Sequence, residues 1–87
     1  MPTINLRGAE KTLAKDQKGA VLSPIQGMVL RLLVKAGDKV AKGKPVVILE
    51  SMKMEMPVES PHAGEVKEVF VFESEMINAG DVLMVIR

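Results

Sequence analysis

Few residues of this chain have the types and spacing that chemistry requires. The chain has no cysteine, so it offers neither a thiolate nucleophile nor a thiolate zinc site. His62 is the only histidine. No motif places a carboxylate or a nucleophile beside it, so we expect a solvent-exposed loop side chain without a catalytic or metal-binding role. The remaining candidate is the amine of Lys53, at the centre of Glu50-Ser51-Met52-Lys53-Met54-Glu55.

Lys53 stands between two copies of one sequence pattern. A shift of 37 residues, without a gap, aligns Val21-Leu22-Ser23-Pro24 with Val58-Glu59-Ser60-Pro61. The same shift aligns further apolar and turn residues: Gly27 with Gly64, Val29 with Val66, Val34 with Val71, Val40 with Ile77, and Gly43 with Gly80. A structural duplication is the simplest interpretation. It explains the apolar framework but not the segment around Lys53, which belongs to neither copy, so we expect the function there.

Length and composition are those of one small domain. The chain has 87 residues, a formal charge of +1 and 2% aromatic residues. Nucleic-acid binding is therefore not expected, because it depends on basic surfaces and on rings that stack against bases. No apolar run is long enough to span a membrane, and the first residues lack the pattern of a signal peptide. We expect a soluble, cytoplasmic protein with a core of Val, Ile, Leu and Met.

Short apolar segments separated by turn residues predict an all-β sandwich or barrel. The expected strands cover residues 21–23, 28–35, 46–49, 58–60, 66–72 and 82–86, and Val40 and Ile77 are isolated apolar anchors. A few isolated strands are unstable in water. The two copies should therefore fold onto one another with approximate two-fold symmetry.

The chain between Leu49 and Val58 must then reverse direction in a hairpin. Met52 and Lys53 lie near its middle, so we expect Lys53 to project from the tip. Two-fold symmetry would place this tip far from both termini. Residues 1–19 are mostly polar and lack a sustained period, so we predict a flexible tail or linker before a domain at 20–87.

The segment around Lys53 resembles the attachment site of the biotinyl domains of biotin carboxyl carrier proteins. Their motif is Glu-Ala-Met-Lys-Met, and this chain has Glu50-Ser51-Met52-Lys53-Met54. The framework is similar as well, in Ser23-Pro24-x-x-Gly27, Lys35-Ala36-Gly37-Asp38-x-Val40, Lys42-Gly43 and Gly80-Asp81-Val82-Leu83. The resemblance covers about residues 20–87. It implies a barrel-sandwich hybrid of two antiparallel four-stranded sheets with pseudo-two-fold symmetry and without the thumb insertion of some members.

The resemblance also implies a function. A biotin protein ligase would join biotin to the Lys53 amine as an amide. Biotin would then carry a carboxyl group from a biotin carboxylase subunit to a carboxyltransferase subunit, or act in a decarboxylase. The domain would be a carrier and not itself an enzyme. Met52 and Met54 would serve recognition by the ligase and the partner enzymes, although ordinary packing at a hairpin end is the alternative. Glu50 and Ser51 complete the motif. A glutamate such as Glu50 at a hairpin is more often a charge that aids solubility than a specific contact.

Three positions depart from the family pattern. Ser51 replaces alanine, which should not prevent modification. Ser74 replaces a glycine in the second copy, and because serine lacks glycine's freedom at positive φ we expect that turn to differ in shape. Phe72 replaces a polar residue and would either form a docking patch or pack against the N-terminal tail.

Two other functions stay open. A lipoyl-type swinging-arm carrier would share the fold and an exposed hairpin lysine, but Met52 and Met54 argue against it. The chain could also be an unmodified scaffold or interaction module. A self-sufficient enzyme is not expected, since the sequence shows no nucleophile, general-base pair or cofactor loop.

Overall fold

A computed structural model describes residues 18–87, which form eight strands and no helix. The strands are β1 (Ala20–Leu22), β2 (Gly27–Leu32), β3 (Lys39–Val40), β4 (Pro45–Ser51), β5 (Met54–Glu59), β6 (Gly64–Val69), β7 (Met76–Ile77) and β8 (Val82–Ile86). In residues 18–87 no helix is long and apolar enough to cross a membrane. The tail predicted for residues 1–19 lies outside the described residues, except for Lys18 and Gly19.

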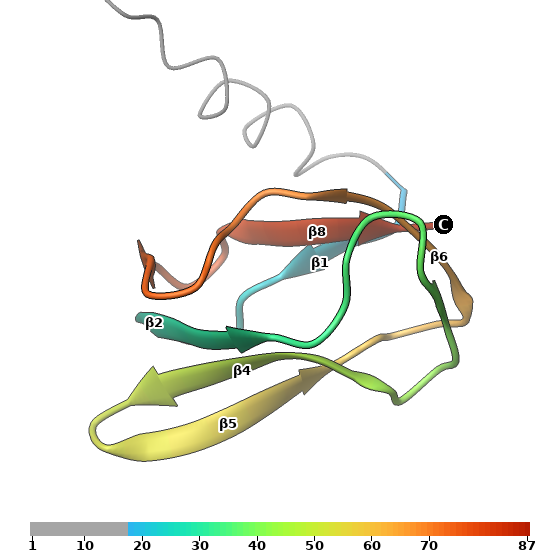
Figure 1. Cartoon of the computed structure of the whole chain (residues 1–87). Coiled ribbons are helices and arrows are strands. Elements are labelled where there is room, and N and C mark those ends of the chain that lie inside the picture. The colour runs from blue at the N-terminus through green and yellow to red at the C-terminus, as the bar shows by residue number, and fades with distance from the viewer. Residues whose placement is uncertain (1–17) are drawn as a thin grey trace, which may run out of the picture.

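The strands form two four-stranded sheets, with the orders β1-β8-β6-β3 and β5-β4-β2-β7. Every pairing between neighbouring strands is antiparallel. The sheets make the two layers of Figure 1, with β8 and β1 above and β4 and β5 below. This confirms the predicted flattened barrel-sandwich of two antiparallel sheets.

Aliphatic side chains fill the space between the sheets. They come from both layers, and the most deeply buried ones include Val29, Val47, Leu49, Val66 and Leu83. The predicted anchors Val40 and Ile77 belong to the same core, with 6% and 2% of their surface exposed. Since aliphatic burial is the main favourable term in folding, this shared core joins the two layers into one unit.

The 37-residue repeat is also a repeat of strands. Strands β2, β3 and β4 correspond to β6, β7 and β8, and β1 corresponds to β5. Each sheet takes its two central strands from one copy and its two edge strands from the other. Neither copy can therefore complete a sheet alone, and this is the pseudo-two-fold arrangement that the sequence predicts.

Two of the predicted strands end earlier than expected. The strand predicted for residues 28–35 ends at Leu32, and the one predicted for 66–72 ends at Val69. One further hydrogen bond follows in each case, from Leu33 N to Val46 O at 3.0 Å and from Phe70 N to Leu83 O at 2.9 Å. The chain then leaves the ladder, because the next residue in each copy turns into the core between the sheets.

The turn around Ser74 was expected to differ from its counterpart around Gly37, and that expectation is wrong. Ser74 takes a φ of 76°, in the same left-handed region as Gly37 at 96°. Ser74 N donates to Val29 O at 2.6 Å, and Gly37 N donates to Val66 O at 2.8 Å. Pairing with the neighbouring strand holds Ser74 in a conformation that glycine adopts more readily.

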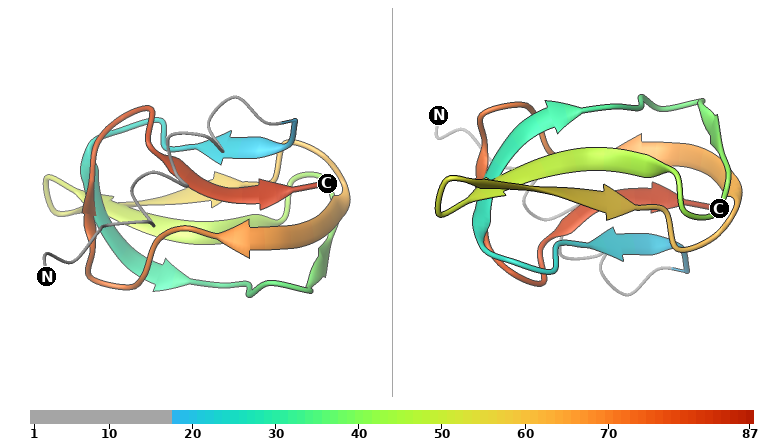
Figure 2. Two further views of the ribbon diagram at one scale, coloured as in Figure 1. Left: turned by 90° about the horizontal axis from the view of Figure 1, so that it is seen from above. Right: turned by 90° about the horizontal axis from the view of Figure 1, so that it is seen from below.

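The β4–β5 hairpin and the C-terminus lie at opposite ends of the molecule (Figures 1 and 2). Symmetry explains this separation, because Glu50 at the base of the hairpin is the counterpart of Arg87. Where β4 turns back as a hairpin, the equivalent β8 ends. Ile86 N bonds to Gly19 O at 2.9 Å, so the start of the described chain lies at the C-terminal end too. The prediction that the hairpin tip lies far from the termini is thus confirmed for the C-terminus.

Candidate functional site

The hairpin tip is a two-residue turn. Ser51 pairs with Met54 in the β4–β5 register, so only Met52 and Lys53 form the loop. Both residues have positive φ, 52° and 64°. Positive φ at both central positions is the signature of a type I′ turn, whose twist matches that of the flanking strands.

Met52 and Lys53 are an unusual choice for such a turn. Type I′ turns favour Asn and Gly, because a side chain with a Cβ atom destabilises the left-handed region by roughly 1–2 kcal/mol per residue. Backbone strain of this kind gathers at functional sites, where the surrounding structure maintains it. The strained conformation of the tip makes it a candidate for function.

The hairpin projects beyond the core. Of the six residues of β5, only Val58 is buried. Lys53 is exposed, and within residues 18–87 its amine makes no hydrogen bond or ion pair. Met52 is 92% exposed and Met54 is 72% exposed, so packing does not account for these two methionines. A second protein can reach the amine and both thioethers together.

A close backbone contact fixes the base of the hairpin. A Cβ atom on Gly27 would lie 2.5 Å from the carbonyl oxygen of Glu50, so only glycine lets β2 approach β4 here. At the opposite end, a Cβ atom on Gly64 would lie 3.0 Å from the carbonyl oxygen of Arg87. Glu50 and Ser51 are half-buried at this base; they support the tip and do not form part of it.

Strand β5 is an edge of its sheet, and Pro57 protects that edge. Ser51 and Met54 form the hydrogen-bonded pair that closes the turn, and such pairs alternate along an antiparallel ladder. Ile48 and Pro57 are therefore a non-hydrogen-bonded pair, so the nitrogen of Pro57 faces outward. The missing N–H removes a donor that another strand could use. Pro57 thus makes the exposed edge of β5 a poorer template for strand addition.

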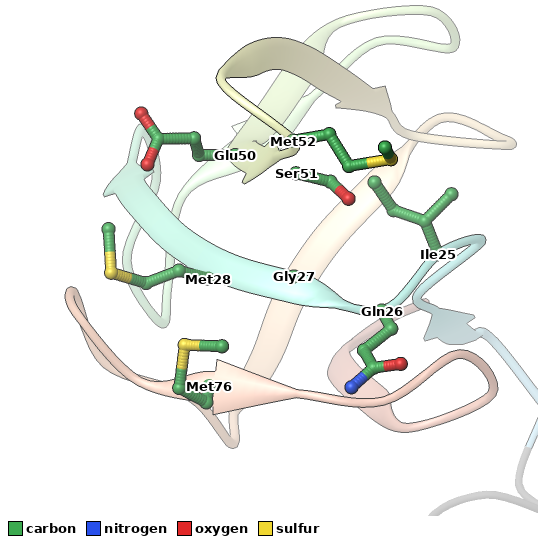
Figure 3. Close-up of a pocket in the computed structure, with 8 residues that line it drawn as sticks. All are labelled: Ile25, Gln26, Gly27, Met28, Glu50, Ser51, Met52 and Met76. Carbon is green, nitrogen blue, oxygen red and sulfur yellow. The ribbon is translucent and has the colours of Figure 1, made fainter.

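A groove lies beside the hairpin. It has a volume of about 690 Å³, and its lining residues are Ile25, Gln26, Gly27, Met28, Glu50, Ser51, Met52 and Met76. Figure 3 shows Met28 and Met76 side by side on neighbouring strands, and Met52 running toward Ile25. Met28 and Met76 are register partners of β2 and β7.

Five of the lining residues, Ile25, Gln26, Gly27, Met28 and Met76, lie outside the motif and were not predicted as site residues. Comparison of the two copies could have found the two methionines. The counterpart of Met28 is Glu65, and that of Met76 is Lys39.

His62 differs from its prediction as a solvent-exposed side chain. It is half-buried, and its Nε2 lies 2.5 Å from the carbonyl oxygen of Ile86. The imidazole therefore holds the end of β8, at the end of the molecule away from the hairpin. Among residues 18–87, no group of three or more histidine, aspartate or glutamate side chains could hold a metal ion.

Phe72 is half-exposed, at 53%. The alternative that it packs against the N-terminal tail concerns residues outside the described part of the chain.

Comparisons with known proteins agree on the family. The family described as "Biotin-requiring enzyme" matches residues 19–86. The Biotin/lipoyl attachment protein of Bacillus subtilis (strain 168) is 50% identical over 58 residues, which are 67% of this chain and 80% of that protein. This chain belongs to the biotin-requiring enzyme family. It is a biotinyl carrier domain, and the cofactor of the family is biotin.

Larger relatives contain the same domain. Mitochondrial pyruvate carboxylase of Mus musculus is 42% identical over 73 residues, which are 84% of this chain and 6% of that enzyme. The crystal structure of the Kluyveromyces lactis urea carboxylase superposes with a TM-score of 0.76 at 32% identity, covering 83% of this chain and 6% of that one. The biotinyl domain thus spans a small fraction of the carboxylases that it resembles.

Proposed function

We propose that the Lys53 amine is the attachment point of biotin and that a biotin protein ligase forms the amide. The observation that supports this most directly is the tip itself, an exposed amine on a strained two-residue turn. The Lys53 amine also has the chemistry that attachment of biotin requires. An unpaired primary amine can be acylated, and amide formation replaces its ammonium charge with a neutral linkage.

The geometry favours acylation at Lys53 over the two strand lysines, Lys39 and Lys67. An amine within a strand approaches a second active site together with the flat sheet around it. Lys53 instead lies at the tip of a hairpin, and the residues of its outer strand, β5, are all exposed except Val58. Met52 and Met54 would enter the ligase with it, offering unbranched thioethers that adapt to differently shaped surfaces.

The proposed role is that of a carboxyl carrier in a biotin-dependent carboxylase. When bound, biotin supplies the carboxyl-transfer chemistry. The chain contributes the tether and its position, which turn an encounter in solution into a local search at an effective concentration on the order of mM. A biotin carboxylase and a carboxyltransferase are the proposed partners, since the relatives that match this chain include pyruvate carboxylase and urea carboxylase.

Intact-mass measurement after co-expression with a biotin protein ligase tests the attachment. We expect one biotin per chain on Lys53, none on Lys53→Arg, and normal loading of Lys67→Arg, which changes another exposed lysine. A parallel co-expression with a lipoyl ligase tests the rival carrier. Biotin on another residue, or a lipoyl group alone, would refute the proposal.

The partner assignment needs a second experiment. The biotinylated chain is mixed with a biotin carboxylase, ATP and bicarbonate, and then with a carboxyltransferase and its acceptor. Product should depend on wild-type chain loaded with biotin and disappear with Lys53→Arg. If the Lys53→Arg chain supports the same turnover, the carrier role is wrong.

A further inference from the structure

The two-fold symmetry provides an internal reference for the groove beside the hairpin. On the terminal side of the molecule, Lys39 of β3 pairs with Glu65 of β6. The equivalent partners on the hairpin side are Met76 of β7 and Met28 of β2. The two pairs occupy equivalent positions in the fold. The pair at the terminal end is charged, and the pair at the hairpin end consists of two methionines.

The thioether pair is not a requirement of packing. Met76 is 69% exposed, and the Lys39–Glu65 pair shows that the backbone accepts charged residues at these positions. Covering exposed apolar side chains removes their surface from water, which lowers the free energy. The difference between the two ends therefore indicates a ligand for the groove on the hairpin side.

The size of the groove argues for a small group. Eight residues line it, whereas a stable protein interface uses roughly 20–30 residues on each side. The groove is open to solvent, so a small group would lie against its lining and would not be enclosed by it. Its lining is mainly apolar, and the three residues Gln26, Glu50 and Ser51 are polar, a mixture that is common at small-molecule sites.

The lining matches one candidate in particular. The ring system of biotin has apolar faces, two ureido N–H donors and one carbonyl acceptor. The Ser51 hydroxyl can both donate and accept, and it points toward the side where Met52 and Ile25 lie, whereas the Gln26 amide and the Glu50 carboxylate lie at opposite edges of the groove (Figure 3). Methionine adapts its shape to an irregular apolar surface. The groove therefore offers the ring an apolar surface and, at Ser51, a polar contact.

Attachment at Lys53 would also favour the biotin ring as the ligand of this groove. The groove is bounded by Met52, the residue next to Lys53. An arm attached there would search the groove at an effective concentration on the order of mM. At an intrinsic dissociation constant of about 1 mM, it would be docked about half of the time.

We propose that this groove is a resting seat for the ring of the biotin attached to Lys53. The inference rests on the proposed attachment at Lys53. It means that the arm does not swing freely between partner enzymes, but returns to the Met28–Met76 pair and must leave it to react.

Methyl NMR of the chain with ¹³C-labelled methionines tests the seat directly, after intact mass has verified loading. On biotinylation, the methyl signals of Met28 and Met76 should shift and show nuclear Overhauser contacts to the ring. The signal of Met84, which is fully buried, should stay in place. Met54 is the local control, because it is close to the new amide but does not line the groove. Shifts confined to Met52 and Met54 would overturn the seat while leaving the attachment intact, and failure to load Lys53 would overturn the attachment instead.

The molecule also supplies a matched pair of variants. Met28→Glu with Met76→Lys recreates at the hairpin end the pair that the other end already carries. Glu65→Met with Lys39→Met makes the reverse change away from the hairpin. The first variant should release the arm, so that avidin captures it about twofold faster than in wild type. The second should be captured at the wild-type rate. Equal capture rates for all three chains would show that the groove does not hold the arm.

Discussion

Ser23 and Ser60 are equivalent residues that make the same hydrogen bonds in the two halves of the domain. Ser23 Oγ donates to the carbonyl oxygen of Ile25 at 2.7 Å, and Ser60 Oγ donates to that of His62 at 2.6 Å. Both serines are buried, 3% and 2% exposed. In each copy the serine hydroxyl satisfies the carbonyl at the bend before the central strand.

The backbone of each serine is held by a turn from the other copy. Ser23 N donates to Asp81 O and Ser60 N donates to Lys44 O, both at 2.8 Å. In return, Gly80 N donates to Ser23 O and Gly43 N donates to Ser60 O, also at 2.8 Å. These reciprocal bonds join the two copies at symmetric positions, and a copy on its own would leave these backbone groups without their partners.

The hydroxyls of Ser23 and Ser60 should therefore contribute equally to the stability of the fold. We expect Ser23→Ala and Ser60→Ala each to lower the free energy of unfolding by about 1–3 kcal/mol, because each leaves a partly buried carbonyl without its donor. Urea unfolding of both variants measures this. A loss in one variant and none in the other would contradict the equivalence of the two halves.

The pair of turns at Gly37 and Ser74 allows a test in both directions. Ser74→Gly should raise the free energy of unfolding by about 1 kcal/mol, because glycine adopts positive φ without the Cβ penalty. Gly37→Ser should lower it by about the same amount. Apart from Gly37 and its two chain neighbours, no heavy atom lies within 4 Å of a Cβ built on Gly37, so the loss would come from the backbone alone. Thermal unfolding should show shifts of roughly 4–8 °C in opposite directions. Shifts of the same sign would mean that the strain at Ser74 is not real.

The hairpin tip should trade stability against function. Replacing Met52 and Lys53 by Asn and Gly installs the residues that a type I′ turn favours. We expect the melting temperature of this double variant to rise by roughly 4–8 °C for each kcal/mol of strain removed, while biotinylation is abolished. Lys53→Ala serves as the control. It keeps a Cβ at positive φ, so it should lose biotin without gaining stability.

The core anchors on the short strands should be intolerant of charge. Val40→Asp and Ile77→Asp each place a carboxylate in the shared core, where these residues are 6% and 2% exposed. An unpaired buried charge destabilises a protein strongly, so we expect each variant to lose several kcal/mol, on the order of 3 or more. Circular dichroism melts of the two variants check this. Melting at the wild-type temperature in either case would show that the residue is not part of the core.

Much of this protein is determined by its sequence alone. The shifted copies of Val, Gly, Ser and Pro predict a two-layer β structure, because strands need apolar runs and turns need residues that accept unusual backbone angles. The position of Met52 and Lys53 between the copies predicts a hairpin tip. The motif around Lys53 identifies the family. These features are local in the chain, or repeat within it, so they can be read without coordinates.

Tertiary structure decided the rest, because it depends on residues that are distant in sequence. Strand pairing holds Ser74 in a conformation that its residue type does not favour, and a carbonyl at the end of β8 gives His62 a partner. Pairing of β2 with β7 brings Met28 next to Met76 and places both beside the hairpin. Spacing along the chain carries no record of such contacts, since they form only when the two copies fold together.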